Sequence, residues 1–336
     1  MKNSKTIIIA EAGVNHNGLI NNAMKLIDVA ANAKADFIKF QTFNTDKLTI
    51  KKARKANYQL KTSDKKETQF QMLKKLEIKK NDHFKLLKYC NKRKVKFLTS
   101  LFDNESINII NLLNLKFLKI PSGEITNLPY LEKIGKLKKT IFLSTGMSFM
   151  YEIEKAVEIL VKNGTNKSNI YVLHCNTEYP TPFEDVNLNA IKTIKNKLKL
   201  KVGYSDHTLG NEVSIAAVAM GCEVIEKHIT LNKLMKGPDH KSSMNPNEFI
   251  KFVKMIRNVE VSFGSKIKKP SKSEIKNIKS IRKSIYASKI INKGEIFTKE
   301  NISIKRPFNG VNPMKINTIY GKKAKKKYFI DDLISK

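Results

Sequence analysis

Residues 6–41 read T-I-I-I-A-E-A-G-V-N-H-N-G-L-I-N-N-A-M-K-L-I-D-V-A-A-N-A-K-A-D-F-I-K-F-Q and contain one strand–helix–strand unit. A β-branched run, Thr6–Ala10, is followed by an amphipathic segment, Ala23–Ala33, and then by a second apolar run, Phe37–Gln41. Two strands separated by a segment of helix length run parallel in one sheet, because the crossover returns the chain to the same end. The stretch therefore predicts an α/β protein with a parallel sheet.

The same alternation continues to about residue 262. Six further candidate strands follow: Lys96–Thr99, Phe117–Ile120, Thr140–Ser144, Ile170–His174, Lys201–Tyr204 and Val224–His228. The helical patterns between them are Asp82–Cys90, Met150–Lys162, Ala190–Lys197 and Asn211–Met220. Eight such units in about 250 residues predict a (β/α)₈ TIM barrel. The alternative is a doubly wound sheet, which requires a glycine-rich phosphate turn, and neither G-x-G-x-x-G nor a P-loop occurs in the sequence.

The composition changes after the barrel, and we predict three parts. Residues 1–262 form the barrel, and residues 263–280 form a linker that is rich in Lys and Ser and lacks a clear apolar period. Residues 281–336 form a small domain, rich in strand or mixed, because short apolar pairs alternate there with turns. Within the barrel, residues 43–65 form a long segment after the second strand, and a loop of that length is usually functional or mobile.

The formal net charge is +34, with 64 Lys and Arg against 30 Asp and Glu, which raises the possibility of a basic nucleic-acid-binding protein. Only five of the 64 are Arg, and the Lys are spread along the whole chain. Base and phosphate recognition favours Arg, so we interpret most of the charge as a solvated surface. No apolar run approaches the ~18 residues of a membrane span, and the three Cys form no CxxC pair. We expect a cytoplasmic protein.

Polar side chains gather where the predicted strands end. Five of the six His fall in these strings: His16, His174, His207, His228 and His240. The sixth, His83, falls in a helical segment, and we predict an ordinary surface position for it. TIM barrels carry their chemistry at the carboxyl ends of the strands. Two lysines inside apolar runs, Lys39 and Lys119, together with nearby hydroxyls, suit a phosphorylated anion.

His207 and His228 end neighbouring strands, which brings two imidazoles to one rim. Three carboxylates are close to them in sequence or strand order: Asp206, Glu226 and Asp239. Imidazole and oxygen ligands together suit manganese, iron, cobalt or zinc. The alternative is a pair of hydrogen-bonded histidines with no metal, and the 21-residue separation does not decide between them.

Taken together, the strings resemble the N-acetylneuraminate (sialic acid) synthase family from end to end. The residues that carry the resemblance are I-I-A-E-A-G-V-N-H-N-G (8–18), F-I-K-F-Q-T (37–42), I-P-S-G-E (120–124), L-S-T-G-M (143–147), L-H-C-N-T-E-Y-P-T-P (173–182), G-Y-S-D-H-T-L-G (203–210), E-K-H (226–228) and G-P-D-H (237–240). The tail K-G-E-I-F-T-K-E-N-I-S-I-K-R-P-F-N-G, residues 293–310, looks like the C-terminal antifreeze-protein-like (SAF) domain of that family.

The resemblance implies a TIM barrel followed by a SAF domain, assembled as a domain-swapped homodimer. It implies condensation of phosphoenolpyruvate with an N-acylated mannose-type aldose, with release of phosphate. A divalent metal, usually Mn²⁺, would be bound by His207 and His228. Phosphoenolpyruvate would be held by Lys39, Thr99, Lys119, Ser122 and Ser144.

The remaining residues carried over by the resemblance concern catalysis and the sugar. Glu124 would be the key carboxylate and would move a proton of the attacking water. Around the sugar and the metal would lie Glu11, Thr177, Tyr179 and Asp239. Arg306 would reach the active site of the partner subunit, although Phe308 stands where the family often has Gly, so the turn beside Arg306 differs.

Departures from the sialic-acid pattern favour a different sugar. Thr177 stands where sialic-acid members usually carry Asn, and T-E-Y-P is closer to synthases of the N,N'-diacetyllegionaminate type. G-P-D-H-K-S-S and Tyr58-Gln59-Leu60 favour the same type. A changed hydrogen-bonding group in a sugar pocket can reverse the preference between related sugars. We therefore expect 2,4-diacetamido-2,4,6-trideoxymannose as substrate, and N-acetylmannosamine is the alternative. A metal-dependent aldolase that uses pyruvate is the other enzyme class, and it would release no phosphate.

Overall fold

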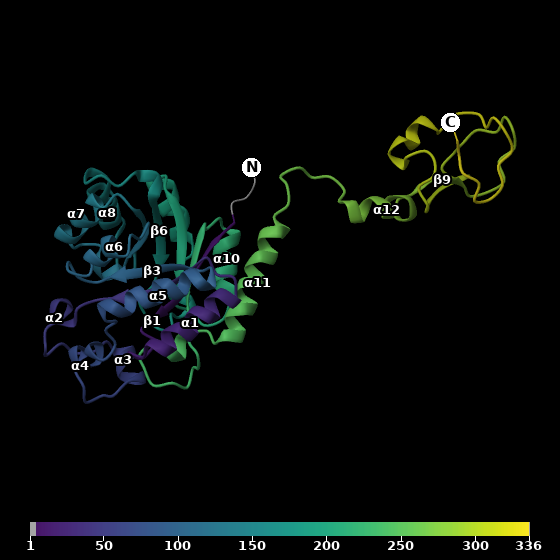
Figure 1. Cartoon of the computed structure of the whole chain (residues 1–336). Coiled ribbons are helices and arrows are strands. Elements are labelled where there is room, and N and C mark those ends of the chain that lie inside the picture. Colours follow the sequence, from purple (N-terminus) through teal and green to yellow (C-terminus); the bar gives the residue numbers. More distant parts are fainter. Residues whose placement is uncertain (1–4, 336) are drawn as a thin grey trace. The chain divides into compact units, whose positions relative to one another are not determined.

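The computed structural model describes residues 5–335, and the chain divides into two compact units, Met1–Phe263 and Gly264–Lys336 (Figure 1). In the first unit eight parallel strands, each hydrogen-bonded to the next, close into a barrel with β1 paired to β8. The helices cover the outside of the barrel. The predicted TIM barrel is confirmed.

The strands begin where the β-branched and aromatic runs begin. Their bounds are β1 Ile7–Gly13, β2 Phe37–Thr42, β3 Lys96–Leu101, β4 Phe117–Ile120, β5 Thr140–Ser144, β6 Ile170–Cys175, β7 Lys201–Asp206 and β8 Val224–His228. Three of them, β4, β5 and β8, have the predicted bounds. The other five end one to three residues later than predicted, and the added residues include the polar Glu11, Ser100 and Asp206; β1 also begins one residue later.

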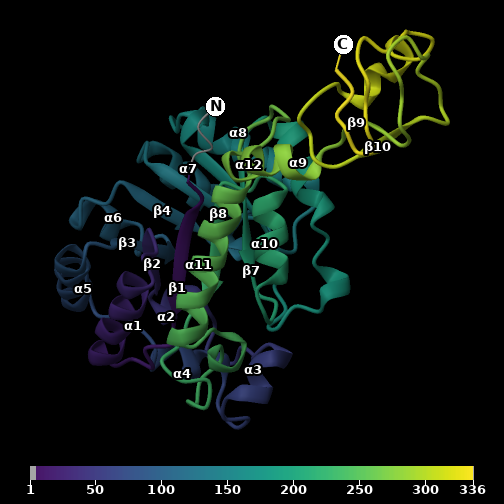
Figure 2. The same cartoon turned by 90° about the vertical axis from the view of Figure 1, so that its right-hand side faces the viewer.

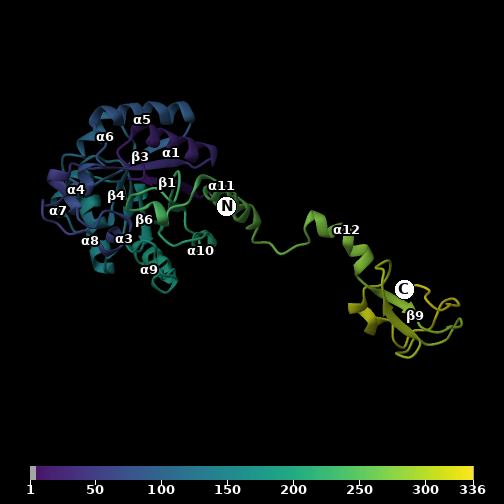
Figure 3. The same cartoon turned by 90° about the horizontal axis from the view of Figure 1, so that it is seen from below.

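Eleven helices belong to the described part of the first unit. They are α1 Ile20–Asn32, α2 Thr45–Leu48, α3 Asn57–Thr62, α4 Gln69–Lys74, α5 Lys80–Arg93, α6 Asn108–Leu112, α7 Leu128–Lys136, α8 Met150–Lys162, α9 Asn189–Leu198, α10 Glu212–Ala219 and α11 Pro246–Ser262. Figure 2 shows α11 between α1 and α10, and Figure 3 shows α1 beside α5. Each long helix buries one face, and the buried residues recur with the 3.6-residue period of an amphipathic helix.

The barrel has two separate apolar cores. Between strands and helices lies the larger one, which includes Leu26, Leu118 and Phe252. Inside the barrel, at the end where the strands begin, six buried residues form a plug: Ile9, Phe37, Leu98, Phe142, Leu173 and Val224. Phe37 packs edge-on against Phe117 at 5.0 Å and Phe142 at 5.7 Å between ring centroids. The plug closes this end of the barrel, so a cavity can form only at the other end.

Residues 43–79 connect β2 to α5, and their first part, residues 43–65, differs from the single long loop that we predicted. The whole connection contains three short helices, α2, α3 and α4, and three of its residues, Phe43, Met72 and Leu76, pack with Val14 in a small apolar cluster. Isolated helices of four to six residues are unstable in water, so other interactions must hold them.

The second unit contains α12 Lys272–Ile281, β9 Ser284–Ala287 and β10 Ile302–Lys305, with β9 and β10 antiparallel. Its own core includes Ile285, Phe297 and Tyr328. Most of α12 falls in the range predicted as a linker. The capping box at its start, in which Ser271 and Glu274 exchange side-chain and backbone hydrogen bonds, is the signal that could have revealed this helix. From residue 5 to residue 335, no helix is long and apolar enough to cross a membrane.

Candidate active site

Each strand contributes one side chain to a ring that lies two residues beyond the apolar plug. The ring residues are Glu11, Lys39, Ser100, Lys119, Ser144, Cys175, Ser205 and Glu226. They share the inner face with the plug residues because successive side chains of a strand point to opposite faces. All eight line a cavity of about 570 Å³ at the carboxyl ends of the strands.

Glu226 is the centre of the charges in this ring. Its carboxylate lies 2.8 Å from Nζ of Lys39 and 3.0 Å from Nζ of Lys119, and it accepts a hydrogen bond of 2.8 Å from Ser205. Glu11 pairs with the same Lys39 at 2.8 Å. Two buried cations and two buried carboxylates thus neutralise one another at the floor of the cavity.

These contacts shift the titration of the buried groups. Burial would raise the pKa of Glu226, but the charges of Lys119 and Lys39 outweigh it and hold that pKa well below its usual range. Burial lowers the pKa of Lys39 to about 7, although Glu226 opposes the shift. An anionic ligand close to Lys39 would favour its charged form, so the site is suited to gain positive charge when an anion binds.

His207 and His228 lie side by side above the ring, with their ring centroids 5.3 Å apart. His207 donates its Nδ1–H to the backbone carbonyl of Asn176, which leaves Nε2 as an unprotonated nitrogen. Nδ1 of His228 is buried and has no hydrogen-bond partner within residues 5–335. Burial lowers the pKa of both rings, to about 4 for His207, so both are neutral at pH 7. Two neutral imidazoles with free nitrogens fit a divalent metal that takes its other ligands from water or substrate.

Carboxylates do not complete a metal cluster around these imidazoles. Among the described residues, no group of three or more His, Cys, Asp or Glu side chains is placed to hold one ion. The candidate donors that the described residues bring together here are thus the two imidazoles, and further ligands would have to come from water or substrate.

A cluster of aromatic rings forms one wall of the cavity. The ring of Tyr179 lies 4.1 Å from that of His207 and 4.9 Å from that of Tyr58, measured between centroids. Asp239 lines the same part of the cavity, and burial raises the pKa of its carboxyl to about 7. A carboxyl that titrates near neutral pH can both accept and donate a proton in the working range.

Another part of the cavity wall carries small polar groups. Ser122 Oγ accepts a hydrogen bond of 2.9 Å from the backbone N–H of Gly146 and lies 3.3 Å from Sγ of Cys175. A Cβ atom at position 146 would come within 2.6 Å of Thr177 Cγ2 and 2.9 Å of Ser122 Oγ, so glycine is required for this close approach. The predicted residues Ser144 and Thr177 also line the cavity.

Two predicted site residues lie elsewhere. Thr99 points outward from β3, and its hydroxyl lies 2.6 Å from that of Thr42 between the barrel and α5. Its neighbour Ser100 lines the cavity in its place. The carboxylate of Glu124 is not part of the cavity wall: it accepts a hydrogen bond of 2.6 Å from Asn127, and burial raises its pKa. The proton-transfer role predicted for Glu124 stays a prediction.

Two further expectations concern residues outside the cavity. His83, predicted at the surface, is buried against the barrel, where its Nε2 lies 2.8 Å from Thr42 Oγ1. The reason is that α5 packs this face on the sheet. Arg306 lies just after β10 in the second unit, where it is exposed.

Three ring residues were not predicted in these positions: Ser100 and Ser205 had no predicted site role, and Glu226 was considered only as an oxygen ligand for a metal. The signal that could have found them is the strand period of two. Counting inward positions from the apolar plug leads from Leu98 to Ser100 and from Val224 to Glu226, because i and i+2 share a face.

Comparison with known proteins agrees with this geometry. The chain matches the NeuB family over residues 26–268 and the SAF domain over residues 282–336. It is 53% identical to the N,N'-diacetyllegionaminic acid synthase of Campylobacter jejuni over 98% of this chain and 99% of that protein. Identity to the N,N'-diacetyllegionaminic acid synthase of Legionella pneumophila is 42%, covering 94% of this chain and 89% of that one.

A solved structure shares the architecture as well. The crystal structure of N-acetylneuraminic acid synthetase from Leptospira borgpetersenii superposes with a TM-score of 0.71 at 35% identity, covering 82% of this chain and 91% of that one. The predicted resemblance to sialic acid synthases, the TIM barrel and the C-terminal SAF domain are thereby confirmed. With a matching family region of this extent and relatives similar over nearly their whole length, the chain belongs to the NeuB family of synthases.

Proposed function

We propose that this protein is an N,N'-diacetyllegionaminate synthase. It condenses phosphoenolpyruvate with 2,4-diacetamido-2,4,6-trideoxymannose and water, and it releases phosphate. The observation that carries the reaction class is the ring of buried lysines and serines beneath two adjacent imidazoles. The observation that favours this sugar is the 53% identity to a synthase of that name over 98% of the chain.

Phosphoenolpyruvate is a small, highly charged anion, and the floor of the cavity suits it. Lys39 and Lys119 supply positive charge, and Ser122 and Ser144 supply hydroxyl donors. When the anion binds, each lysine exchanges part of its pairing with Glu226 for pairing with the ligand. The lysines then offset the charge of the phosphate as it leaves.

The sugar occupies the part of the cavity beside Tyr179 and Asp239, where Glu11 and Thr177, which also line the cavity, can reach it. Carbon three of phosphoenolpyruvate forms a bond to the aldehyde carbon, and the aldehyde oxygen gains a proton. Water adds to carbon two and loses one proton. The hydroxyl so formed loses its second proton as the bond from that carbon to the phosphate oxygen breaks, which leaves a keto group and a phosphate that takes up the proton. Asp239, whose pKa is about 7, is the carboxyl in the cavity wall that is best suited to pass these protons.

His207 and His228 hold the divalent metal, and Mn²⁺ is the ion that we propose. A metal there supplies Lewis-acid polarisation of the aldehyde oxygen. The chain's own contribution is to keep both rings neutral by burial and to fix His207 through the carbonyl of Asn176. His207→Ala and His228→Ala should each lower bound manganese, measured by elemental analysis after gel filtration, and unchanged metal content in both would contradict the assignment.

We also propose a homodimer in which Arg306 of one copy serves the site of the other. Loops that follow β5, β7 and β8 expose large apolar side chains: Met147, Phe149, Leu209 and Leu234. Such a group at the mouth of the barrel is typical of a covered surface. Sedimentation equilibrium tests the dimer, and Arg306→Ala tests the contribution of the second unit.

We propose that the protein works in the cytoplasm, because its three cysteines are all free and buried.

The deciding experiment mixes purified, manganese-loaded protein with phosphoenolpyruvate and one sugar at a time. Phosphate release is followed by a coupled assay and the product by mass spectrometry. We expect kcat/KM for the 2,4-diacetamido sugar to exceed that for N-acetylmannosamine by about tenfold or more, because a changed polar group in the pocket separates related sugars. A preference for N-acetylmannosamine would overturn the proposed sugar, and no phosphate with either would overturn the synthase.

A further inference from the structure

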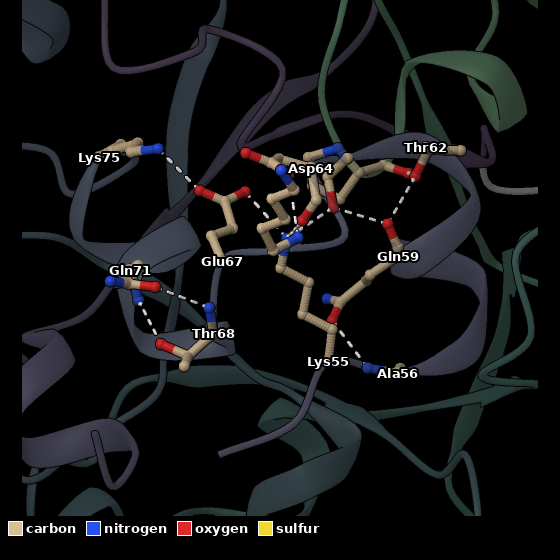
Figure 4. Close-up of polar contacts among 12 residues, drawn as sticks. Lys55, Ala56, Gln59, Thr62, Asp64, Glu67, Thr68, Gln71 and Lys75 are labelled. Carbon is tan, nitrogen blue, oxygen red and sulfur yellow. Dashed lines mark hydrogen bonds and ion pairs between the residues drawn. The ribbon is translucent and has the colours of Figure 1, made fainter. Parts of the chain in front are cut away.

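Lys55 is a buried cation that lies outside the ring of charges described above. Its side chain has 0% exposure, and its Nζ donates to three acceptors (Figure 4). These are Oγ of Ser63 at 3.0 Å, the backbone carbonyl of Asp64 at 2.6 Å and the carboxylate of Glu67 at 2.9 Å. An ammonium has three protons, so every donor of Lys55 is used.

The charge of Lys55 favours one conformation of this segment over others. A buried ammonium is costly unless it is paired and hydrogen-bonded, so conformations that separate Lys55 from these acceptors are disfavoured. Glu67 is also paired with Lys75 at 2.7 Å. Burial would raise the pKa of Glu67, but hydrogen bonds from Lys75 and Lys55 outweigh it and lower that pKa, so the carboxylate stays charged. We call these four residues, Lys55, Ser63, Asp64 and Glu67, the lysine clamp.

The clamp encloses helix α3, whose first residue is Asn57 and whose last is Thr62. Lys55 precedes the helix by two residues, and Ser63 follows it directly. Ser63 Oγ donates a further bond of 2.6 Å to the carbonyl of Gln59, and the side chain of Gln59 accepts from the backbone N–H of Ala56. A helix of six residues is unstable alone, because its own hydrogen bonds are too few. The contacts of the clamp, which join the residues before and after the helix, stabilise it.

Helix α3 carries side chains into the cavity. Asn57, Tyr58 and Gln59 line it, and the ring of Tyr58 packs against that of Tyr179 with 4.9 Å between centroids. At its other end, Thr62 Oγ1 donates to the carbonyl of Pro238 at 3.0 Å, next to Asp239. The helix therefore joins the aromatic wall to the loop of the titrating carboxyl, on the side of the cavity that we assign to the sugar.

We propose that Lys55 is a positioning residue for sugar binding: the lysine clamp holds α3 so that Tyr58 closes the sugar side of the cavity against Tyr179. This rests on the proposed function, because it presupposes that a sugar occupies that side. Lys55 contacts none of the ring residues that we assign to phosphoenolpyruvate. Its effect should therefore separate the two substrates.

The test compares Lys55→Met with Lys75→Met. Both remove one ion pair to Glu67, but Lys55 is fully buried whereas the side chain of Lys75 is 71% exposed. In steady-state kinetics with the 2,4-diacetamido sugar, we expect Lys55→Met to raise KM for the sugar about tenfold, the cost of losing one charged hydrogen-bond network. KM for phosphoenolpyruvate should change less than about twofold, and Lys75→Met should change neither by more than that.

A double-mutant cycle tests whether Lys55 affects sugar binding through Tyr58. If Lys55 acts through Tyr58, the effects of Lys55→Met and Tyr58→Ala on the sugar KM should fail to add, since residues of one network are energetically coupled. Additive effects, or equal rises in both KM values, would overturn the proposal. Should Lys55→Met fail to fold, Glu67→Gln removes the charged partner instead and should show the same split between substrates.

The failure of this inference can be told apart from failure of the proposed function. Hydrogen–deuterium exchange of residues 56–62 should rise in Lys55→Met and not in Lys75→Met, a result that requires no turnover. If the wild type condenses no sugar, the proposed function fails, and unchanged exchange in Lys55→Met shows in addition that no clamp exists. If the wild type is active but Lys55→Met keeps the wild-type sugar KM, only the positioning role is refuted.

Discussion

The plug and the ring inside the barrel lie two residues apart on the same strands and differ completely in chemistry. Phe37 and Val224 belong to the apolar plug, whereas Lys39 and Glu226 belong to the ring. All four share one face because the side-chain period of a strand is two. Burial alone therefore does not separate core from site. The ring tolerates buried charge because cations and carboxylates pair there and a cavity opens above them.

The largest expected effect comes from removing a charge of the ring. Lys39→Met should lower kcat/KM for phosphoenolpyruvate by about 10³- to 10⁴-fold, about 4–5.5 kcal/mol, because a buried charge partner of the anion is lost. The matched control is Lys96→Met, which removes an exposed lysine at the start of β3, the plug end of the barrel. That control should change kcat/KM by less than about twofold. Similar losses in both variants would show that net charge, not the ring, binds the substrate.

A truncation in the plug should act on stability instead. Phe142 is fully buried, and Phe142→Ala should lower the free energy of unfolding by about 3–4 kcal/mol through lost apolar burial and the cavity left behind. Urea unfolding followed by circular dichroism measures this, and KM for phosphoenolpyruvate in the folded protein should stay within about twofold. The division between plug and ring is contradicted by a loss of substrate binding without a loss of stability.

The third prediction concerns pH and Asp239. Because burial raises the pKa of this carboxyl from 3.8 to about 7, the folded state binds its proton more tightly than the unfolded state does. Stability from this group is fully present below the unfolded pKa and is lost as pH rises through about 7. Asn cannot ionise, so the free energy of unfolding of Asp239→Asn should not fall in this way. Relative to the wild type, it should rise by roughly 1.4 kcal/mol per pH unit between pH 5 and 7. The gain should level off at higher pH, and a pH-independent difference would contradict the raised pKa.

The smallest expected effect distinguishes two neighbouring hydroxyls of β3. Ser100→Ala should raise KM for phosphoenolpyruvate by about three- to tenfold, the usual range for one lost hydrogen bond. Thr99→Val should leave that KM within about twofold and should lower the free energy of unfolding by about 1 kcal/mol, because its hydroxyl bonds Thr42 outside the barrel. The reverse pattern would show that Thr99, and not Ser100, points into the barrel.

These two hydroxyls also illustrate what the sequence alone could predict. The existence and order of all eight strands followed from β-branched runs, and β4, β5 and β8 were predicted to the residue. The ends of β1, β3 and β7 were not predicted correctly. A polar residue inside a strand looks like the end of that strand, because the sequence does not show the charge that pairs with it across the barrel. Family resemblance named Thr99, whereas only the inward alternation from Leu98 to Ser100 places the right hydroxyl in the cavity.

Segments without an apolar period were the least predictable. Helix α3 depends on Lys55 and its three acceptors, which lie eight to twelve residues further along the chain. No hydrophobic pattern records such a contact, so residues 43–65 looked like one loop. Glu124 is a similar case, since its motif was recognised but the direction of its side chain depends on Asn127.

The most direct test of the central claim, that the charged ring is the phosphoenolpyruvate site, is a crystal structure of the protein soaked with phosphoenolpyruvate. We predict that the anion lies within hydrogen-bond distance of Nζ of both Lys39 and Lys119, with the hydroxyls of Ser122 and Ser144 nearby. Density for the anion at lysines outside the cavity, or an unliganded ring at saturating phosphoenolpyruvate, would contradict the account.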